Sequence, residues 1–168
     1  GIGMDEIDGG PGDDVLRGGE NDDVLRGGSG IDQLYGDGGS DFLFGDAGRS
    51  GDAGEMGDQD APEGSQAGQR LYGGGGIDFL YAYAAVGLNA DPVARAEEMA
   101  LRGDELHGGP GGDWLYGNLR SDILIGGSGN DYLSGDFNAG PLYVRNVLGG
   151  QAGGADQLFG DSGEDQLL

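Results

Sequence analysis

The 168-residue sequence has no cysteine, no lysine and no threonine, and its single histidine is His107. Without cysteine, the chain can form neither a disulfide nor a thiolate metal site. No apolar run reaches the roughly 18 residues that a membrane-spanning helix needs. The motifs G-x-S-x-G and H-E-x-x-H and the P-loop are also absent, so the sequence predicts no catalytic centre within this chain.

Positive charge is scarce as well, because eight arginines face 31 aspartates and glutamates and the formal net charge is −23. Such a chain is not expected to bind nucleic acid or an anionic membrane. The lack of threonine removes the regular hydroxyl array that an ice-binding surface would use. What is abundant is glycine, with 42 residues, a composition that indicates disorder unless the glycines recur at a fixed period.

The glycines recur with a period of nine residues. Residues 9–44 form four consecutive nonapeptides, GGPGDDVLR, GGENDDVLR, GGSGIDQLY and GDGGSDFLF. Each begins with a glycine-rich hexapeptide that ends in Asp, and continues with a triplet that has Leu at its centre. Glycine can bend the chain so that carbonyl groups point inward, and Asp adds a hard carboxylate oxygen, the ligand type that calcium prefers. The triplet alternates as a β-strand does, with Leu on one face and its neighbours on the other.

This nonapeptide resembles the repeat of the RTX (repeats-in-toxin), or hemolysin-type, calcium-binding proteins, which include secreted bacterial toxins, proteases, lipases, epimerases and adhesins. The resemblance implies an all-β fold, a right-handed parallel β-roll (a β-helix-like solenoid) in which two nonapeptides make one turn and the leucines of two sheets meet. It also implies type I secretion and a secreted, extracellular or cell-surface location. From its length we expect a single domain over 1–168, as a piece of a longer protein.

Counting the repeat along the whole chain gives thirteen units. Their sixth positions are Asp5, Asp14, Asp23, Asp32, Asp41, Gln69, Asp78, Asp104, Asp113, Asp122, Asp131, Asp156 and Asp165. Two positions later the residue is Ile7 in the first unit and Leu in every other unit, which predicts a core of leucines.

Because successive units alternate between the two edges of a β-roll, the sixth positions divide into two sets. The edge that we call the first edge holds Asp5, Asp23, Asp41, Asp78, Asp113, Asp131 and Asp165. The second edge holds Asp14, Asp32, Gln69, Asp104, Asp122 and Asp156. Three insertions, about 46–69, 82–103 and 137–153, and the altered hexapeptide GNLRSD all fall on the second edge. We therefore expect one continuous calcium ladder and one decorated edge.

Stacked turns place carboxylates about 5 Å apart, where two of them repel by about 1 kcal/mol in water and by more near a protein surface. Since no lysine offsets this repulsion, the ladder needs metal ions, and flexible turns rich in carbonyls favour several calcium ions over magnesium. The resemblance implies that each ion lies between neighbouring loops of one edge, bound by the sixth-position Asp and by carbonyl oxygens of the second and fourth positions. The residues that this assigns as metal ligands are Gly3, Asp5, Gly10, Gly12, Asp14, Gly19, Asn21, Asp23, Gly28, Gly30, Asp32, Asp37, Gly39, Asp41, Gly74, Gly76, Asp78, Asp104, Gly109, Gly111, Asp113, Asp122, Gly127, Gly129, Asp131, Asp156, Asp161, Gly163 and Asp165.

Two units of the second edge depart from this pattern. Gln69 has lost the carboxylate, so no strong site is expected there. Arg120 stands at a glycine position of the loop that ends in Asp122, and would have to adopt a glycine-like backbone conformation.

The three insertions differ in composition. Residues 46–69 are small, polar and acidic and predict a surface loop. Within it, Asp58, Asp60 and Glu63 form either an additional ion site or a solvated charge cluster. Residues 137–153 are apolar enough to predict a short buried hairpin or flap.

The insertion 82–103 predicts a short helix at about 92–102. Asp91 is a suitable N-cap, Pro92 suits the first helical position, and Gly103 follows the helix at its C-terminal end. The apolar face of this helix consists of Val93, Ala96, Met99 and Ala100. We expect that face to pack on the roll.

Aromatic residues gather at outward-facing positions of the strands that follow the first-edge loops. They are Phe42, Phe44, Phe79, Tyr81, Trp114, Tyr116 and Tyr132. Contiguous apolar patches of this kind are rarely left bare. Either the insertions fold over the patch, or it binds a protein, a glycan or a second copy of the chain through Phe42, Phe79, Trp114 and Tyr132. His107 lies in a flanking position of the other sheet and is expected to be a surface residue.

Two functions are compatible with these observations, and both depend on folding that is coupled to calcium binding outside the cell. In the first, the chain is a structural, adhesive or self-assembling segment of a secreted or cell-surface protein. In the second, it is the calcium-folded C-terminal secretion and folding module of a secreted protease, lipase, epimerase or toxin. Three insertions exceed what a simple folding module needs, which favours the first.

Overall fold

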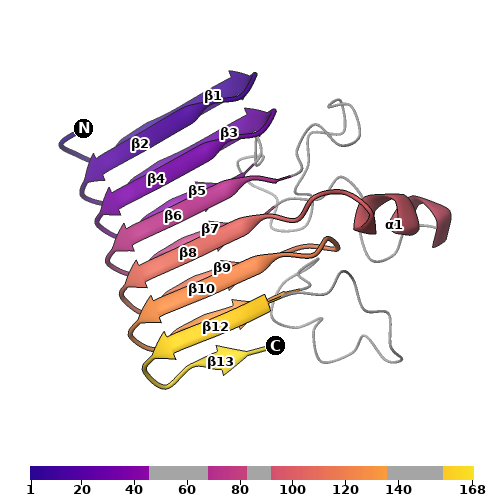
Figure 1. Cartoon of the computed structure of the whole chain (residues 1–168). Coiled ribbons are helices and arrows are strands. Elements are labelled where there is room, and N and C mark those ends of the chain that lie inside the picture. Colours follow the sequence, from indigo (N-terminus) through magenta and orange to yellow (C-terminus); the bar gives the residue numbers. More distant parts are fainter. Residues whose placement is uncertain (46–67, 83–91, 136–156) are drawn as a thin grey trace.

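In the computed structural model of the chain, residues 1–45, 68–82, 92–135 and 157–168 are described, and these residues form a parallel β-roll of two facing sheets (Figure 1). One sheet has seven strands, in the order β1 (Glu6–Pro11), β3 (Val24–Ser29), β5 (Phe42–Phe44), β7 (Phe79–Tyr81), β9 (Trp114–Tyr116), β11 (Tyr132–Ser134) and β13 (Gln166–Leu167). The other has six, in the order β2 (Val15–Glu20), β4 (Gln33–Gly38), β6 (Arg70–Gly75), β8 (Glu105–Pro110), β10 (Ile123–Ser128) and β12 (Gln157–Ser162). The predicted all-β fold class is confirmed.

The two sheets show that successive nonapeptides alternate, as the repeat predicted. Each strand pairs in parallel with the strand of the next-but-one unit, so that Leu25 lies opposite Leu43, and Leu16 lies opposite Leu34. The insertions do not disturb this register, because Leu43 lies opposite Leu80 although the chain between them includes residues 46–67. The repeat count therefore predicts which strands pair even where the spacing of nine is broken.

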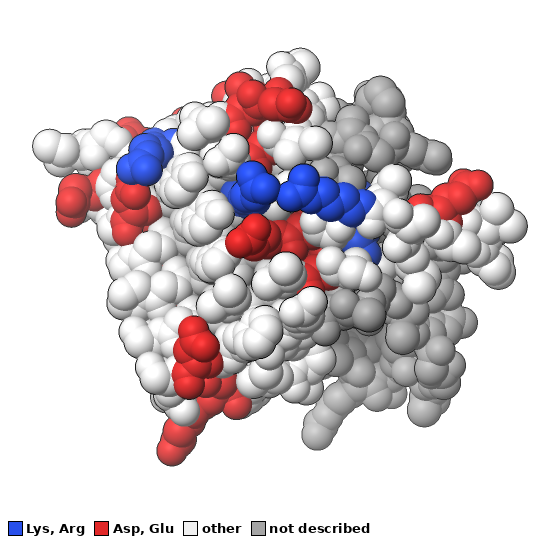
Figure 2. Space-filling view, viewed as in Figure 1, with Lys and Arg blue, Asp and Glu red and all other residues white. Residues whose placement is uncertain are grey.

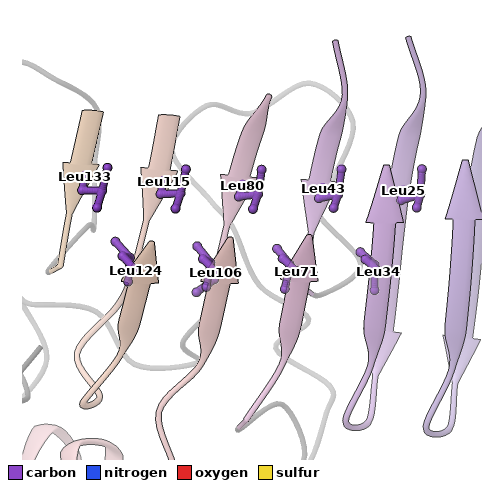
Figure 3. Packing of buried hydrophobic residues seen from close by; sticks show 10 residues of the cluster. Leu25, Leu34, Leu43, Leu71, Leu80, Leu106, Leu115, Leu124 and Leu133 are labelled. Carbon is purple, nitrogen blue, oxygen red and sulfur yellow. The ribbon is translucent and has the colours of Figure 1, made fainter. Parts of the chain in front are cut away.

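The core between the sheets is a double row of leucines (Figure 3). The fully buried members are Leu25, Leu34, Leu43, Leu71, Leu80, Leu106, Leu115, Leu124 and Leu133. Burying one such side chain stabilises the fold by about 1.5–3 kcal/mol. Ile7, Leu16 and Leu158 are only partly buried, because they belong to the terminal turns of the stack.

The two edges of the roll differ in how the strands continue into the loops. At the first edge, strands of the six-stranded sheet extend into the loop and pair there, for example Gly19 with Asp37, and Gly109 with Gly127. These loops form one column at the left of Figure 1. At the second edge, β5, β7, β9 and β11 are only three residues long. The chain enters the insertions after β5, β7 and β11, and returns in β6, β8 and β12.

The helix α1 (Pro92–Met99) begins at the predicted proline and ends three residues before the predicted position 102. The expectation that it packs on the roll is wrong, because α1 contacts no strand among the described elements and lies beyond the strand ends (Figure 1). Val93 is 65% exposed. The facing sheets already cover the leucine core, so the small apolar face of α1 has no apolar surface of the core to bury against.

Gly103 has a different role from the predicted one. A Cβ built on it would overlap the backbone carbonyl of Ser121, so glycine allows the close approach of two turns rather than closing α1. The N-cap Asp91, the acidic cluster of Asp58, Asp60 and Glu63, and the predicted hairpin at 137–153 lie outside the described residues. The one helix in the described part is too short and too polar to cross a membrane.

The seven predicted aromatic residues line the seven-stranded sheet in two stacked columns. The first column is Phe42, Phe79, Trp114 and Tyr132, with successive ring centroids 4.8, 6.0 and 5.0 Å apart. The second is Phe44, Tyr81 and Tyr116, at 5.2 and 4.9 Å. Phe42 and Trp114 remain 39% and 36% exposed, whereas Tyr116 is buried. The first column is therefore open to solvent in part, and the second is covered at Tyr116.

Candidate metal site

The path of the loops directs carbonyl oxygens along each edge. The second and fourth positions of the hexapeptides have positive φ, as in Gly10 (84°) and Gly12 (127°). Asn21, Asp37 and Asp161 occupy the same positions with φ of 79°, 73° and 65°, values that Asn and Asp tolerate better than other residues with a Cβ. Of the expected carbonyl donors, Gly111 is an exception in that it is not among the positive-φ residues.

A second observation shows where these carbonyls point. A Cβ built on Gly28 would overlap the carbonyl oxygen of Gly10, one turn earlier on the same edge. On the first edge, a Cβ on Gly76 would overlap the carbonyl oxygen of Gly39 in the same way. The carbonyls of the second and fourth positions therefore point along the stack into the neighbouring loop.

The sixth-position carboxylates also connect neighbouring turns, through one of their two oxygens. The N–H of Asp23 donates to Oδ1 of Asp41 at 2.8 Å, and the N–H of Asp41 donates to Oδ1 of Asp78 at 2.8 Å. The pattern continues to Asp113 at 2.9 Å and from there to Asp131 at 2.9 Å. Sequence reasoning treated the carboxylate only as a metal ligand and missed that Oδ1 fixes the register of the stack.

The other oxygen, Oδ2, is buried and accepts no hydrogen bond from any residue in the described part of the chain. This holds for five consecutive aspartates of the first edge, which are Asp23, Asp41, Asp78, Asp113 and Asp131, and for Asp14 on the second edge. A buried acceptor without a donor costs about 1–3 kcal/mol, and more when it is charged. Such a regular column of unsatisfied oxygens indicates a partner that is not a protein group.

The surroundings of Oδ2 consist of further oxygens. In the loop of Asp14, a Cβ built on the first-position Gly9 would lie 2.8 Å from Oδ2 of Asp14 and 2.6 Å from the carbonyl oxygen of Gly27. The same arrangement recurs on the first edge at Gly73, beside Asp78 and Gly108. Sequence reasoning did not assign these first-position glycines, although every complete first-edge hexapeptide begins with one. Their missing Cβ leaves the space in which the carboxylate and carbonyl oxygens meet.

This donor set fits calcium. Calcium binds six to eight hard oxygens, from carboxylates and backbone carbonyls alike, in flexible geometry. In the described part of the chain, no three side chains of His, Cys, Asp or Glu cluster as a metal site. Any ion held here depends on backbone carbonyls, and so on the folded path of the loops.

Burial raises the pKa of four first-edge carboxylates, those of Asp41, Asp78, Asp113 and Asp131, so that they resist ionisation in the absence of a cation. It raises the pKa of Asp78 to about 7, and the carboxylates of Asp113 and Asp41 add to the shift. Burial likewise raises the pKa of Asp113 to about 6, with a contribution from Asp131. The pKa values of Asp41 and Asp131 are raised for the same reasons. The ladder thus favours either protons or a metal ion on these oxygens.

The burial of the ladder also explains the appearance of the surface. Eight of the sixth-position aspartates are buried, which are Asp23, Asp32, Asp41, Asp78, Asp104, Asp113, Asp122 and Asp131. Figure 2 shows Asp and Glu in separate groups on the face that it draws, with uncharged surface between them. Twelve of the 31 acidic residues in the sequence are sixth-position aspartates of the two edges.

The second edge departs from this arrangement after Asp32. Gln69 takes the place of a carboxylate, and its Oε1 accepts the N–H of Asp32 at 2.6 Å. Its Nε2 donates to the carbonyl oxygen of Gly30 at 2.9 Å. The amide therefore keeps the bond that sets the register, and supplies a donor to a fourth-position carbonyl that was expected to bind metal.

At Asp104 both carboxylate oxygens have protein partners. Oδ1 accepts the N–H groups of Gly68 and Gln69, each at 2.7 Å. Oδ2 accepts Nδ2 of Asn118 at 2.7 Å and lies 3.4 Å from Nη1 of Arg120. Burial raises the pKa of Asp104 to about 6, while Arg120 and the hydrogen bonds lower it.

Arg120 does not adopt the glycine-like conformation that the sequence led us to expect. It is not among the residues with positive φ, and its side chain is fully buried beside Asp104. The loop instead bonds internally, since the N–H of Arg120 donates to Oδ1 of Asn118 at 2.9 Å and the N–H of Asn118 donates to Oδ2 of Asp122 at 2.6 Å. Sequence reasoning missed Asn118. The signal was that the second and fourth positions of one loop are both hydrogen-bond donors, whereas most other loops have glycine at one or both of these positions.

The remaining expected ligands lie at the ends of the stack or outside the described residues. Asp5 and Asp165 are half-buried in the terminal turns of the first edge. Their loops contribute Gly3 and Gly163, both with positive φ. Asp156 lies outside the described residues.

A comparison with protein families agrees with the geometry. The family model described as the RTX calcium-binding nonapeptide repeat (4 copies) matches residues 1–34, 17–50, 63–85, 107–139 and 152–167. The chain belongs to this family. Its RTX repeats are calcium-binding, and they build the β-roll described above. The matched ranges leave out 86–106, which includes α1 and the turn of Asp104. No curated protein matches the chain.

Proposed function

We propose that this RTX roll is a single domain over 1–168 that folds when calcium binds outside the cell, and that it serves as a structural or adhesive segment of a secreted or cell-surface protein. The observation that supports calcium-dependent folding is the column of five consecutive buried aspartates whose Oδ2 atoms accept no hydrogen bond. No group in the described ranges satisfies these atoms, and in this proposal a cation completes the folded ladder.

In this proposal, calcium ions are held between neighbouring loops of the first edge, by Oδ2 of the sixth-position aspartates and by carbonyls of the second and fourth positions. When bound, they supply the positive charge that offsets repulsion between carboxylates. The chain itself does the rest. The Oδ1 atoms set the register between turns, the glycines admit the carbonyls, and the leucines close the core.

The coupling to location follows from the calcium affinity of such sites. Extracellular calcium-binding modules have dissociation constants of about 10⁻⁴–10⁻³ M. At the much lower free calcium inside a cell, the uncompensated carboxylates oppose folding, and the chain is available for secretion as an unfolded polypeptide. Outside, calcium binding stabilises the folded roll by mass action.

The partly exposed aromatic column supports the structural or adhesive role over a pure folding module. Phe42, Phe79, Trp114 and Tyr132 form one stacked row on the outer face, with Phe42 and Trp114 open to solvent. Stacked rings of this kind can bind a protein, a glycan or a second copy of the chain. The second candidate is the C-terminal folding module of a secreted enzyme. The uninterrupted first edge favours it, because such a module needs only one calcium ladder.

A calcium titration tests the proposal. Far-UV circular dichroism should change from coil to β-structure as calcium is added, and chelator should reverse the change, whereas magnesium at equal concentration should not reproduce it. β-Structure that persists in excess chelator at neutral pH contradicts calcium-dependent folding.

Light scattering in the same titration tests the adhesive role. Calcium-dependent self-association that is lost in the Phe42→Ala/Trp114→Ala variant supports association through the aromatic column. A roll that stays monomeric and binds no glycan in an array favours the folding-module candidate.

A further inference from the structure

Two donor side chains of the second edge stand at the loop positions whose backbone carbonyls are the expected metal ligands in the other loops. Asn118 and Arg120 occupy the second and fourth positions of the loop that ends in Asp122. They are 3% and 0% exposed, and both side chains reach Oδ2 of Asp104 in the neighbouring turn. The equivalent Oδ2 atoms of the first edge have no such donor.

The groups that these two side chains direct at Oδ2 of Asp104 are N–H donors, whereas a metal ion needs free acceptor oxygens. Arginine carries five N–H donors and no acceptor, and its charge is permanent in proteins. Asp104 accepts hydrogen bonds on both carboxylate oxygens, so it has little remaining capacity to coordinate a metal ion. A divalent ion placed there would also meet the buried positive charge of Arg120 at close range, where the low dielectric strengthens repulsion.

A buried arginine destabilises the fold unless an opposite charge lies beside it. The charge of Arg120 is compensated by Asp104, at 3.4 Å. Nη1 of Arg120 lies against Oδ2 of Asp104, the kind of oxygen that the proposed calcium ions of the first edge would use. The next departure along this edge is of the same kind, because Nε2 of Gln69 donates to the carbonyl of Gly30.

We propose that Arg120, assisted by Asn118, is a built-in counter-ion for Asp104, and that the roll binds no calcium between the turns of Asp104 and Asp122. The β8–β10 pair of the second edge is then joined without metal, while the first edge at the same level needs calcium. This inference rests on the calcium-dependent folding proposed above. Its consequence is a calcium count below that expected from the number of repeats.

The direct test uses the unmodified chain. Crystals grown in saturating calcium and crystals soaked in terbium should show anomalous peaks between neighbouring first-edge loops, and none between Asp104 and Asp122. A peak between Asp104 and Asp122 overturns the inference while leaving calcium-dependent folding intact. A folded roll without peaks on either edge refutes the proposed function instead, so the two failures can be distinguished.

A variant provides the complementary test. Asn118→Gly/Arg120→Gly restores glycine at the second and fourth positions and removes the counter-ion. Isothermal titration should then count one more calcium per chain than in the unmodified protein. Arg70→Met is the matched control, because Arg70 is a partly exposed arginine whose Nε lies 3.6 Å from Oε2 of Glu105, a residue outside the expected ligand set, and its loss should leave the count unchanged. An unchanged count in the folded double variant overturns the inference. If that variant does not fold, the anomalous map of the unmodified chain decides.

Discussion

The two edges of the roll are built from the same nonapeptide, but they differ in what lies against Oδ2 of the sixth-position carboxylates. On both edges, Oδ1 or the Oε1 of Gln69 accepts an N–H from the preceding turn, so the stacking of turns is the same. Among the described residues, the first edge leaves five consecutive Oδ2 atoms without donors, whereas on the second edge this arrangement ends after the turn of Asp32. On the second edge, Asn118 and Arg120 donate to Asp104. Oδ1 therefore sets the register of the turns on both edges, whereas the negative charge at Oδ2 is offset separately, by a cation.

The insertions account for the difference between the edges. Backbone carbonyls can surround an ion only where consecutive loops follow the same path, since each loop directs its carbonyls into the next. We call this arrangement of carbonyls the carbonyl cradle. At the second edge the insertions interrupt the nine-residue spacing of the sequence after Phe44, Tyr81 and Ser134, so consecutive loops of equal length are not available there. Side chains of the protein then supply the donors that the cradle can no longer organise.

The largest expected effect comes from removing one carboxylate at the centre of the first edge. Asp78→Ala removes the acceptor for the N–H of Asp41, which costs about 1–3 kcal/mol. It also removes a ligand of the proposed ions, and losing one ion costs a further 2.7 kcal/mol or so at calcium about a hundredfold above its dissociation constant. We expect a total loss of about 4–6 kcal/mol, a lower calcium count in isothermal titration and a higher calcium midpoint in circular dichroism.

The matched change on the second edge is Gln69→Ala. It removes the hydrogen bonds with Asp32 and Gly30 and should destabilise the calcium-saturated roll by about 1–3 kcal/mol, measured by urea denaturation. The calcium count should not change. If Gln69→Ala reduces the count as Asp78→Ala does, the two edges are equivalent and the comparison fails.

An effect of intermediate size is expected from pH in the absence of calcium. The folded pKa of Asp78 is about 7 and that of Asp113 about 6, both above the ordinary value of 3.8. The metal-free folded state therefore binds more protons than the unfolded state, and its stability rises as pH falls from about 7 toward 4. For Asp78 the contribution is at most on the order of 4 kcal/mol, because one pKa unit corresponds to about 1.4 kcal/mol.

Circular dichroism in excess chelator measures this dependence. In chelator, β-structure should increase on acidification from pH 8 to pH 5. In a separate calcium titration without chelator, the calcium midpoint should rise over the same range because protons compete for Oδ2. The Asp78→Asn variant serves as control and should show a weaker dependence. A metal-free chain that loses structure on acidification would show that the carboxylates are not the obstacle to folding.

The smallest expected effect is that of Gly75→Ala, which is the control in a test of the loop carbonyls at two adjacent glycines. Gly76 has a φ of 144°, and a Cβ on it would overlap the carbonyl oxygen of Gly39. Gly76→Ala should therefore cost about 2–3 kcal/mol in urea denaturation at saturating calcium. A Cβ on the neighbouring Gly75 would meet no atom within 4 Å, so Gly75→Ala should stay within about 0.5 kcal/mol of the unmodified chain. Equal effects would mean that the loops do not stack as described.

Much of the fold was predictable because it depends on local periodicity. The spacing of Asp and Leu predicted the sheet to which each strand belongs, including Leu80 and Leu106 beyond the insertions. The start of α1 at Pro92 followed from capping preferences, but its separation from the roll did not. That outcome depends on which apolar surfaces remain uncovered, which no local pattern states.

The sequence by itself determined the period, the leucine core, the division into two edges and the positions of the carboxylates, because each follows from residue type and spacing alone. Only the tertiary structure decided what each carboxylate oxygen meets. That Oδ1 sets the register, that Oδ2 of Asp78 accepts no hydrogen bond, and that Arg120 lies against Asp104 all depend on groups brought together from neighbouring turns. Contacts between turns join residues 14 or more positions apart in the sequence, and the order of residues within one repeat does not contain them.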